Sequence, residues 1–270
     1  MRDTPAILLN TASIELWPAR LARARSNRDA RLLAQARRVL RRKSDGRFLA
    51  AELPDRLVPL LPHWDRQPGV NTALRALGRA AAAPARVREL PLEGLHTRLD
   101  RLGLDAGEYA NRTGLALIAE PDWLAFAGFD RYRRPLWLHA EAARGWHRLQ
   151  AAALKDNVVL EAVSGYRSHD YQLGIFDRKL ARGLNLDQIL NVNAAPGYSE
   201  HHSGRALDIS APGEPAAEES FEHTHAFAWL RTHAPAYGFV MSYPRDNPHG
   251  IVYEPWHWCF RASELDTAQA

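Results

Sequence analysis

The sequence predicts an α+β protein, in which a small, mainly antiparallel sheet is flanked by helices. Two observations support this prediction. From about residue 135, short apolar runs typical of strands alternate with amphipathic stretches typical of helices. The first part of the chain instead carries apolar residues at helical spacing. We therefore expect a mainly helical, arginine-rich region of unknown role over residues 1–110, and a second domain over 111–270 with its core at 135–262.

Besides a short helical turn that Ser13 would cap and that would run through Glu15 and Leu16, helices are expected at two places in the N-terminal region. Residues 31–42 carry apolar side chains near helical spacing, and arginines occupy the other face of that helix. The arginines concerned are Arg31, Arg37, Arg38, Arg41 and Arg42. A second helix is expected over residues 71–83, ending before Pro84 because proline disfavours a helical residue in front of it.

The second half of the chain predicts strands and helices in mixed order. Helical spacing and stop residues indicate helices at 138–154, 171–182 and 227–233. β-branched and apolar runs indicate strands at 158–163, 206–209, 238–243 and 250–253. This order favours a small sheet covered by helices.

Composition permits an ordinary globular core, since 46% of the 270 residues are hydrophobic and 24% are charged. No apolar run approaches the roughly 20 residues of a membrane span. Residues 1–20 lack the features of a secretory signal. We therefore expect a cytoplasmic protein, or a periplasmic one if the chain lacks its native signal. Cys259 is the only cysteine, so no intramolecular disulfide can form, and we expect its thiol to be buried.

Charge is distributed unevenly along the chain. Residues 1–100 hold 19 Lys and Arg against 10 Asp and Glu, whereas the remainder holds 16 against 21. Such an arginine-rich region can bind nucleic acid, anionic lipid or a protein partner, or its arginines can form a solvated face. No aromatic residues interleave with the arginines, as stacking on single strands requires. The solvated face is favoured, and no nucleic acid partner is expected.

Two short segments near the C-terminal end carry the residues of a metal site. They are residues 199–208 (SEHHSGRALD) and 254–258 (EPWHW). Together they offer two imidazoles and one carboxylate as ligands, with a second carboxylate as a base. Three protein ligands and an open position are typical of catalytic zinc rather than structural zinc. These segments therefore predict a metal-dependent hydrolase.

The spacing within each segment allows its polar side chains to meet. Gly204 lets a loop turn after His201 or His202 and enter the strand that carries Asp208. Residue spacing alone does not distinguish the two adjacent histidines. Glu254 and His257 would face opposite sides of a regular strand, but the proline between them favours a kink that turns both toward one centre.

These segments resemble the VanY-type D-alanyl-D-alanine carboxypeptidases, which belong to the LAS group of zinc peptidases. A third block, residues 164–168 (SGYRS) followed by Gln172, resembles the substrate-binding segment of that family. The resemblance covers about residues 135–262. One departure is Ser242, where many relatives carry arginine.

The resemblance implies one zinc ion per chain, held by His201, Asp208 and His257, and a fold of the LAS type. Glu254 would be the general base and then the acid, and Arg167 would bind the substrate carbonyl and the developing oxyanion. Four further residues are implied in substrate binding: Ser168, Gln172, Tyr166 and Ser199.

The expected function is removal of terminal D-alanine from peptidoglycan stem peptides or muropeptides. The bond cleaved is either the D,D bond of pentapeptides or the L,D bond of tetrapeptides. A cytoplasmic location favours soluble muropeptides and a role in recycling of the cell wall. Two alternatives are a non-catalytic zinc-containing module that binds peptides or proteins, and an arginine-rich nucleic-acid binder with a vestigial peptidase domain. The oligomeric state stays open.

Overall fold

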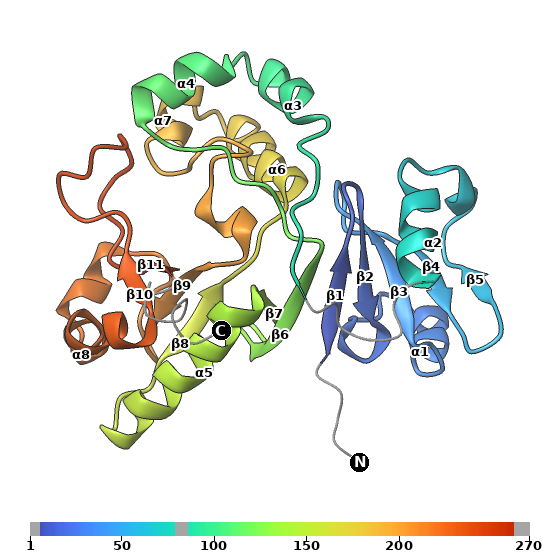
Figure 1. Ribbon diagram of the computed structural model, residues 1–270, viewed down its shortest axis with the longest axis horizontal. Coiled ribbons are helices and arrows are strands. Elements are labelled where there is room, and N and C mark those ends of the chain that lie inside the picture. The colour runs from blue at the N-terminus through green and yellow to red at the C-terminus, as the bar shows by residue number, and fades with distance from the viewer. Residues whose placement is uncertain (1–5, 79–85, 262–270) are drawn as a thin grey trace. The chain divides into compact units, whose positions relative to one another are not determined.

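The computed structural model describes residues 6–78 and 86–261 (Figure 1). The chain forms two compact units that interleave in sequence. Unit 1 comprises Met1–Glu93 and Glu120–Phe126, and unit 2 comprises Gly94–Ala119 and Ala127–Ala270. The division expected at residue 110 stays a prediction. In the part of the chain that the structure describes, no helix is both long and apolar enough to span a bilayer.

Unit 1 is built on an antiparallel sheet. Its strands are β1 (Ile7–Asn10), β2 (Ile14–Pro18), β3 (Arg38–Arg42), β4 (Phe48–Glu52), β5 (Leu57–Pro59) and the first residues of β6 (Trp123–Phe129). Within the unit they follow the order β5-β4-β3-β2-β1-β6. Two helices, α1 (Asn27–Leu33) and α2 (Val70–Gly78), and two short 3-10 helices, η1 (Ala19–Leu21) and η2 (Trp64–Arg66), complete the unit.

The expectation of a mainly helical N-terminal region is wrong. Its first expected helix, over residues 31–42, is divided between the end of α1 and strand β3. The apolar spacing fits a helix, but Leu40 is paired on one side with Leu16 of β2 and on the other with Ala50 of β4. Backbone pairing on both sides and full burial of Val39 and Leu40 outweigh the local pattern.

The arginines of this segment consequently do not share one helix face. Three of them lie on β3, where Arg41 pairs with Glu15 and Arg38 with Glu52. The second expected helix, over residues 71–83, is confirmed as far as Gly78 by α2. Its remaining part and Pro84 lie outside the described residues.

Unit 2 contains a second antiparallel sheet, which carries the candidate site. Its strands are β8 (Glu161–Ser164), β9 (Ala206–Ser210), β10 (Phe239–Met241) and β11 (His257–Phe260), in the order β10-β11-β9-β8. Strand β7 (Pro135–Leu138) also belongs to unit 2. The strand expected over residues 250–253 is absent. The partner of β10 is β11 instead, because a turn over residues 255–256 delays the start of the strand until His257.

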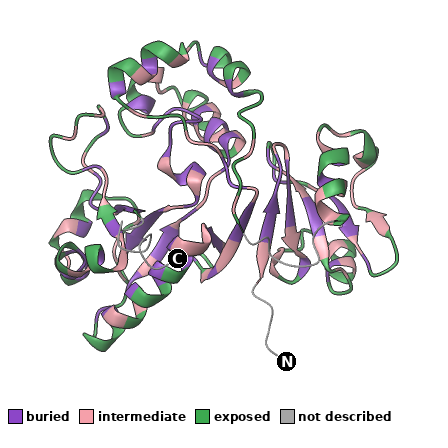
Figure 2. Cartoon of the chain, in the orientation of Figure 1, coloured by how far each residue is buried: buried purple, intermediate pink, exposed green. Residues whose placement is uncertain are grey.

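Helices cover this sheet, and the α+β class is confirmed. The helices are α3 (Leu95–Arg101), α4 (Ala106–Thr113), α5 (Ala140–Lys155), α6 (His169–Leu180), α7 (Leu186–Leu190) and α8 (His225–His233), with the 3-10 helices η3 (Glu200–Ser203), η4 (Glu219–His223) and η5 (Ala234–Tyr237). The buried face of α5 includes Trp146 and Leu149, as its pattern predicts. Figure 2 shows buried and exposed residues alternating along this helix. The helix approaches β11 closely at Gly145, where a Cβ would lie 2.8 Å from the ring of Phe260.

A separate cluster of apolar side chains holds the segment that leads into the site. Helices α3, α4, α6 and α7 pack around Phe176 and Tyr198, which are almost fully buried. The Tyr198 hydroxyl donates to the Ala106 carbonyl at 2.7 Å, and the Ala195 amide donates to the Tyr109 hydroxyl at 3.1 Å. Residues 195–198 are thus fixed just before η3.

Candidate active site

Two neighbouring strands bring a histidine and an aspartate together. In the register between β9 and β11, His257 lies directly opposite Asp208, and Trp258 lies opposite Leu207. Side chains alternate across a strand, so the fully buried Leu207 turns into the core while Asp208 and His257 emerge together on the other face.

The 3-10 helix η3 supplies the second histidine. The helix ends at Gly204, whose φ of 69° lies in the left-handed region that favours glycine, and the chain turns there into β9. The Nε2 atom of His201 consequently lies 3.3 Å from Oδ1 of Asp208. The expectation that the chain turns at Gly204 and enters a strand is confirmed.

The donor atoms of His201, Asp208 and His257 form a cluster that can hold a metal ion. All three residues are buried, and their ligand atoms lie within 4.8 Å of one another. The outer nitrogen of each ring is already engaged. His201 Nδ1 lies 2.7 Å from the Gly165 carbonyl oxygen, which can only accept, and His257 Nε2 lies 2.9 Å from the Glu200 carboxylate. The inner nitrogens therefore face the cluster, as they do in metal-ligating histidines. The buried Nε2 of His201 makes no regular hydrogen bond.

The charges in this cluster favour a cation. Burial would raise the pKa of Asp208, but His201, His257 and Arg167 hold it well below its usual value. Burial lowers the pKa of His201 to about 4, and Arg167 acts in the same direction, so this ring is neutral. Burial would also lower the pKa of His257, but its hydrogen bonds to Asp208 and Glu200 raise it to about 10. A metal ion would replace the proton between His257 Nδ1 and Asp208 Oδ1, which lie 3.2 Å apart.

Glu254 lies beside the cluster without belonging to it. It comes just before the turn that begins β11, and its Oε2 atom lies 3.7 Å from His257 Nδ1. Burial raises the pKa of Glu254 to about 7, although the positive charges of His257 and Arg167 oppose this. A carboxyl group that titrates near neutral pH can both accept and release a proton.

Arg167 faces the cluster from the loop between β8 and α6. One of its terminal nitrogens lies 3.6 Å from Oδ2 of Asp208, and its backbone amide donates to the His201 carbonyl at 3.2 Å. Its buried Nε atom makes no hydrogen bond with the described residues. The guanidinium group therefore keeps a donor available at the edge of the site.

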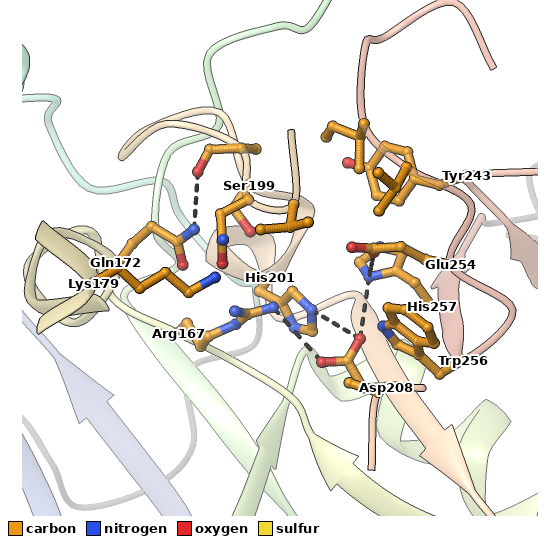
Figure 3. Close-up of a pocket in the computed structure, with 16 residues that line it drawn as sticks. Arg167, Gln172, Lys179, Ser199, His201, Asp208, Tyr243, Glu254, Trp256 and His257 are labelled. Carbon is orange, nitrogen blue, oxygen red and sulfur yellow. Dashed lines mark hydrogen bonds and ion pairs between the residues drawn. The ribbon is translucent and has the colours of Figure 1, made fainter. Parts of the chain in front are cut away.

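These groups line one pocket of about 240 Å³ (Figure 3). Seven of the nine residues expected in the site line it: Arg167, Gln172, Ser199, His201, Asp208, Glu254 and His257. Ser168 and Tyr166 do not. The Ser168 hydroxyl accepts from the Tyr171 amide at 3.1 Å and caps the N-terminus of α6, and the Tyr166 amide donates to the Trp137 carbonyl.

The hydrogen bonds of His202 separate it from its neighbour. Its Nδ1 atom lies 2.7 Å from the Arg167 carbonyl oxygen, and its Nε2 atom accepts from the Gly197 amide at 3.1 Å. Both ring nitrogens are therefore engaged with the backbone, and His201 is the histidine that faces the cluster.

Other residues that line the pocket had no role assigned from the sequence. Among them are Lys179, Tyr243 and Trp256. The ring of Tyr243 lies 4.8 Å from that of His257, and burial raises its pKa above the usual range. Lys179 could have been found, because it follows Gln172 by seven residues, which is two turns of the expected helix. The contact between Glu200 and His257 could not be predicted from the sequence, because the two residues are 57 positions apart and no local pattern links them.

A buried His–Asp–His cluster with a carboxyl group beside it, opening into a pocket, defines a candidate metal-dependent active site. Residues 135–263 match the family model described as VanY, D-alanyl-D-alanine carboxypeptidase. Over this segment, which is just under half of its length, the chain is similar to the VanY family.

Curated relatives are similar to somewhat less than half of the chain. The putative carboxypeptidase YodJ of Bacillus subtilis (strain 168) is 37% identical over 134 residues, which is 48% of each chain. A D-alanyl-D-alanine carboxypeptidase of Enterococcus faecalis is 32% identical over 126 residues, covering 43% of this chain and 45% of the relative. The chain thus spans about half the length of these relatives.

Two solved structures are similar over about half of this chain. The structure of the LdcB LD-carboxypeptidase is 33% identical with a TM-score of 0.45, and the match covers 49% of this chain and 63% of that chain. A vancomycin-resistance D,D-pentapeptidase VanY in complex with Zn(II) is 29% identical with a TM-score of 0.40, and the match covers 49% and 77% of the two chains.

Proposed function

We propose that this chain is a zinc-dependent carboxypeptidase that removes terminal D-alanine from peptidoglycan stem peptides. The observation that supports this most directly is the buried cluster of His201, Asp208 and His257 with Glu254 beside it. The family match points to peptides that end in D-alanine. Both the D,D bond of pentapeptides and the L,D bond of tetrapeptides are candidate substrates.

The donor set fits one zinc ion per chain. Two imidazoles and one carboxylate are three ligands of the kinds that catalytic zinc sites use, and all three residues line the pocket. When bound there, zinc would supply Lewis acidity, which lowers the pKa of a water molecule and polarises the scissile carbonyl.

The remaining steps fall to side chains of the chain itself. Glu254 takes the proton of the attacking water and then delivers it to the nitrogen of the departing alanine. In the metal-free site, burial raises the pKa of Glu254 to about 7, which favours a group that can accept and release a proton. Arg167 donates to the carbonyl oxygen as negative charge develops there.

Four residues seat the peptide in this proposal. Gln172 and Ser199 line the pocket and contact the substrate directly. Ser168 acts by capping α6, the helix that carries Gln172. Tyr166 precedes Arg167 in the loop between β8 and α6, and we assign it to the wall of the substrate path.

The size of the pocket agrees with a short substrate segment. Its volume of about 240 Å³ lies below the roughly 300–1,000 Å³ of pockets that enclose a drug-sized ligand.

The test is incubation of purified, zinc-loaded protein with a mixture of muropeptides, followed by mass spectrometry. Chelator-sensitive loss of one alanine from tetrapeptides would support L,D activity, and loss from pentapeptides would support D,D activity. The Glu254→Ala variant is the control for contaminating peptidases. Zinc binding without cleavage of either substrate would refute the proposal and favour a non-catalytic peptide-binding module.

A further inference from the structure

The pocket contains a second cationic side chain, Lys179, to which the proposed chemistry assigns no role. Lys179 lies in the last turn of α6, two turns after Gln172 on the same face of the helix. Its half-buried side chain lines the pocket. Figure 3 shows its ammonium group directed inward, toward the region between Arg167 and Ser199.

The ammonium group of Lys179 has no anion of its own within the described part of the chain. None of the described carboxylates lies within 4.0 Å of it, and it makes no hydrogen bond there. Burial lowers the pKa of Lys179, and the charge of Arg167 lowers it further, whereas Glu254 opposes the shift. A partly dehydrated cation beside a second cation gains from an anionic ligand.

Two other polar groups of the pocket, those of Gln172 and Arg167, are less suited to an anion. The Gln172 amide nitrogen donates to the Ala194 carbonyl at 2.9 Å, which leaves the amide oxygen Oε1, buried and without a partner, for the substrate. An amide oxygen accepts hydrogen bonds, so it can bind a peptide N–H but repels a carboxylate. Arg167 already faces Asp208. In the proposed function it also binds the carbonyl that reacts.

We propose that Lys179 binds the C-terminal carboxylate of the substrate peptide and thereby restricts the site to free peptide ends. This inference rests on the proposed function and deepens it, since it names the group that separates terminal from internal cleavage. The recognised chemistry is a peptide α-carboxylate one residue beyond the scissile bond.

The test measures equilibrium binding in the absence of turnover. The background protein is the zinc-loaded Glu254→Ala variant, and the probes are diacetyl-lysyl-D-alanyl-D-alanine as the free acid and as its C-terminal amide. Lys179→Gln should weaken binding of the acid by about tenfold, the effect of losing one hydrogen bond to a charged group, and should leave the amide within about twofold. Lys179→Arg, which keeps the charge, should restore most of the preference for the acid.

Arg182→Gln is the matched control, because Arg182 is an exposed cation three residues further on that does not line the pocket. It should change neither affinity. Equal losses for acid and amide in Lys179→Gln, or equal affinity of the background protein for the two probes, would overturn the inference. Turnover of the acid by the protein with Glu254 intact is measured separately, so a failure of the proposed reaction is distinguished from a failure of carboxylate recognition.

Discussion

Substitution of Gly165 by alanine should damage the metal site from a distance. Gly165 lies between β8 and Arg167, and its carbonyl oxygen accepts from His201 Nδ1 at 2.7 Å. A Cβ at this position would lie 2.9 Å from the Trp137 carbonyl oxygen and 2.8 Å from a methyl group of Leu136. The carbonyl oxygen belongs to the backbone of β7, so it cannot rotate away. The backbone of residue 165 must shift instead, and the hydrogen bond that orients His201 shifts with it.

The magnitude follows from these two contacts. Overpacking of a rigid interior costs about 1–3 kcal/mol of the free energy of unfolding, and a backbone oxygen as close neighbour favours the upper part of that range. Disturbing the hydrogen-bond partner of a ligating histidine lowers metal affinity by about 10–100-fold. Since the bond is displaced rather than deleted, we expect a loss of zinc affinity of about tenfold.

The assay compares two glycine substitutions in the same unit. Gly174 lies inside α6, and a Cβ there would contact only the mobile end of Arg178, at 3.2 Å. Gly174→Ala should therefore stabilise the protein by about 0.5–1 kcal/mol, as expected for alanine in a helix. Urea unfolding followed by near-UV circular dichroism gives both stabilities, and competition with a chromophoric chelator gives both zinc affinities. If Gly165→Ala proved as stable as Gly174→Ala and bound zinc as tightly, the reasoning from close approach would be wrong.

Three further predictions concern the site itself. Glu254→Ala should lower turnover by about 10²–10⁴-fold while zinc affinity in chelator competition stays near that of the parent, because Glu254 lies outside the donor cluster and the proposed function makes it the base; a near-native rate would contradict this role. Glu200→Gln should weaken zinc binding by about 10–100-fold, because it removes the charge that holds Nε2 of His257, whereas the exposed Glu218→Gln should have no effect. In the metal-free protein, carbon NMR should show Glu254 titrating near pH 7 rather than 4.5, because burial disfavours its charged form. Because the pKa of Glu254 is higher in the folded than in the unfolded protein, its contribution to the free energy of unfolding is complete below pH 4.5 and is lost as the pH rises through 7. A titration near pH 4.5 in the folded protein would refute the burial argument.

The candidate site was readable from the sequence because its residues fall in three short segments, 164–172, 199–208 and 254–258, which together resemble one family. The turn at Gly204 and the kink after Glu254 follow from the conformational limits of glycine and proline. The choice of His201 over His202 depends instead on backbone atoms of Gly197 and Arg167, which only the folded chain brings to the second ring. Hydrogen bonds of that kind leave no pattern in a single sequence.

The N-terminal unit was misjudged for a different reason. Residues 31–42 satisfy the spacing of an amphipathic helix, and local pattern contains no information about the strands on either side. The pairing of Leu40 with Leu16 and Ala50 settles its conformation. In this unit, hydrogen bonds between strands far apart in the sequence determine the secondary structure. In α5 and α6, by contrast, the apolar spacing of the sequence predicts the helix that the structure contains.

Because the two units interleave in sequence, unit 2 cannot be expressed as one continuous segment of the chain without part of unit 1. The segment that matches the family begins at residue 135, but α3 and α4 come earlier in the chain and still belong to unit 2. They cover Tyr198 and Phe176 and fix the segment that enters η3. A gene fragment that encodes only the matched segment would lack α3 and α4. It would expose the apolar cluster around Tyr198 and Phe176, and the segment before His201 would lose the hydrogen bonds that fix it. The heritable module is therefore larger than its sequence signature, and it cannot be excised with unit 1 intact, because residues 120–126 of unit 1 lie inside it.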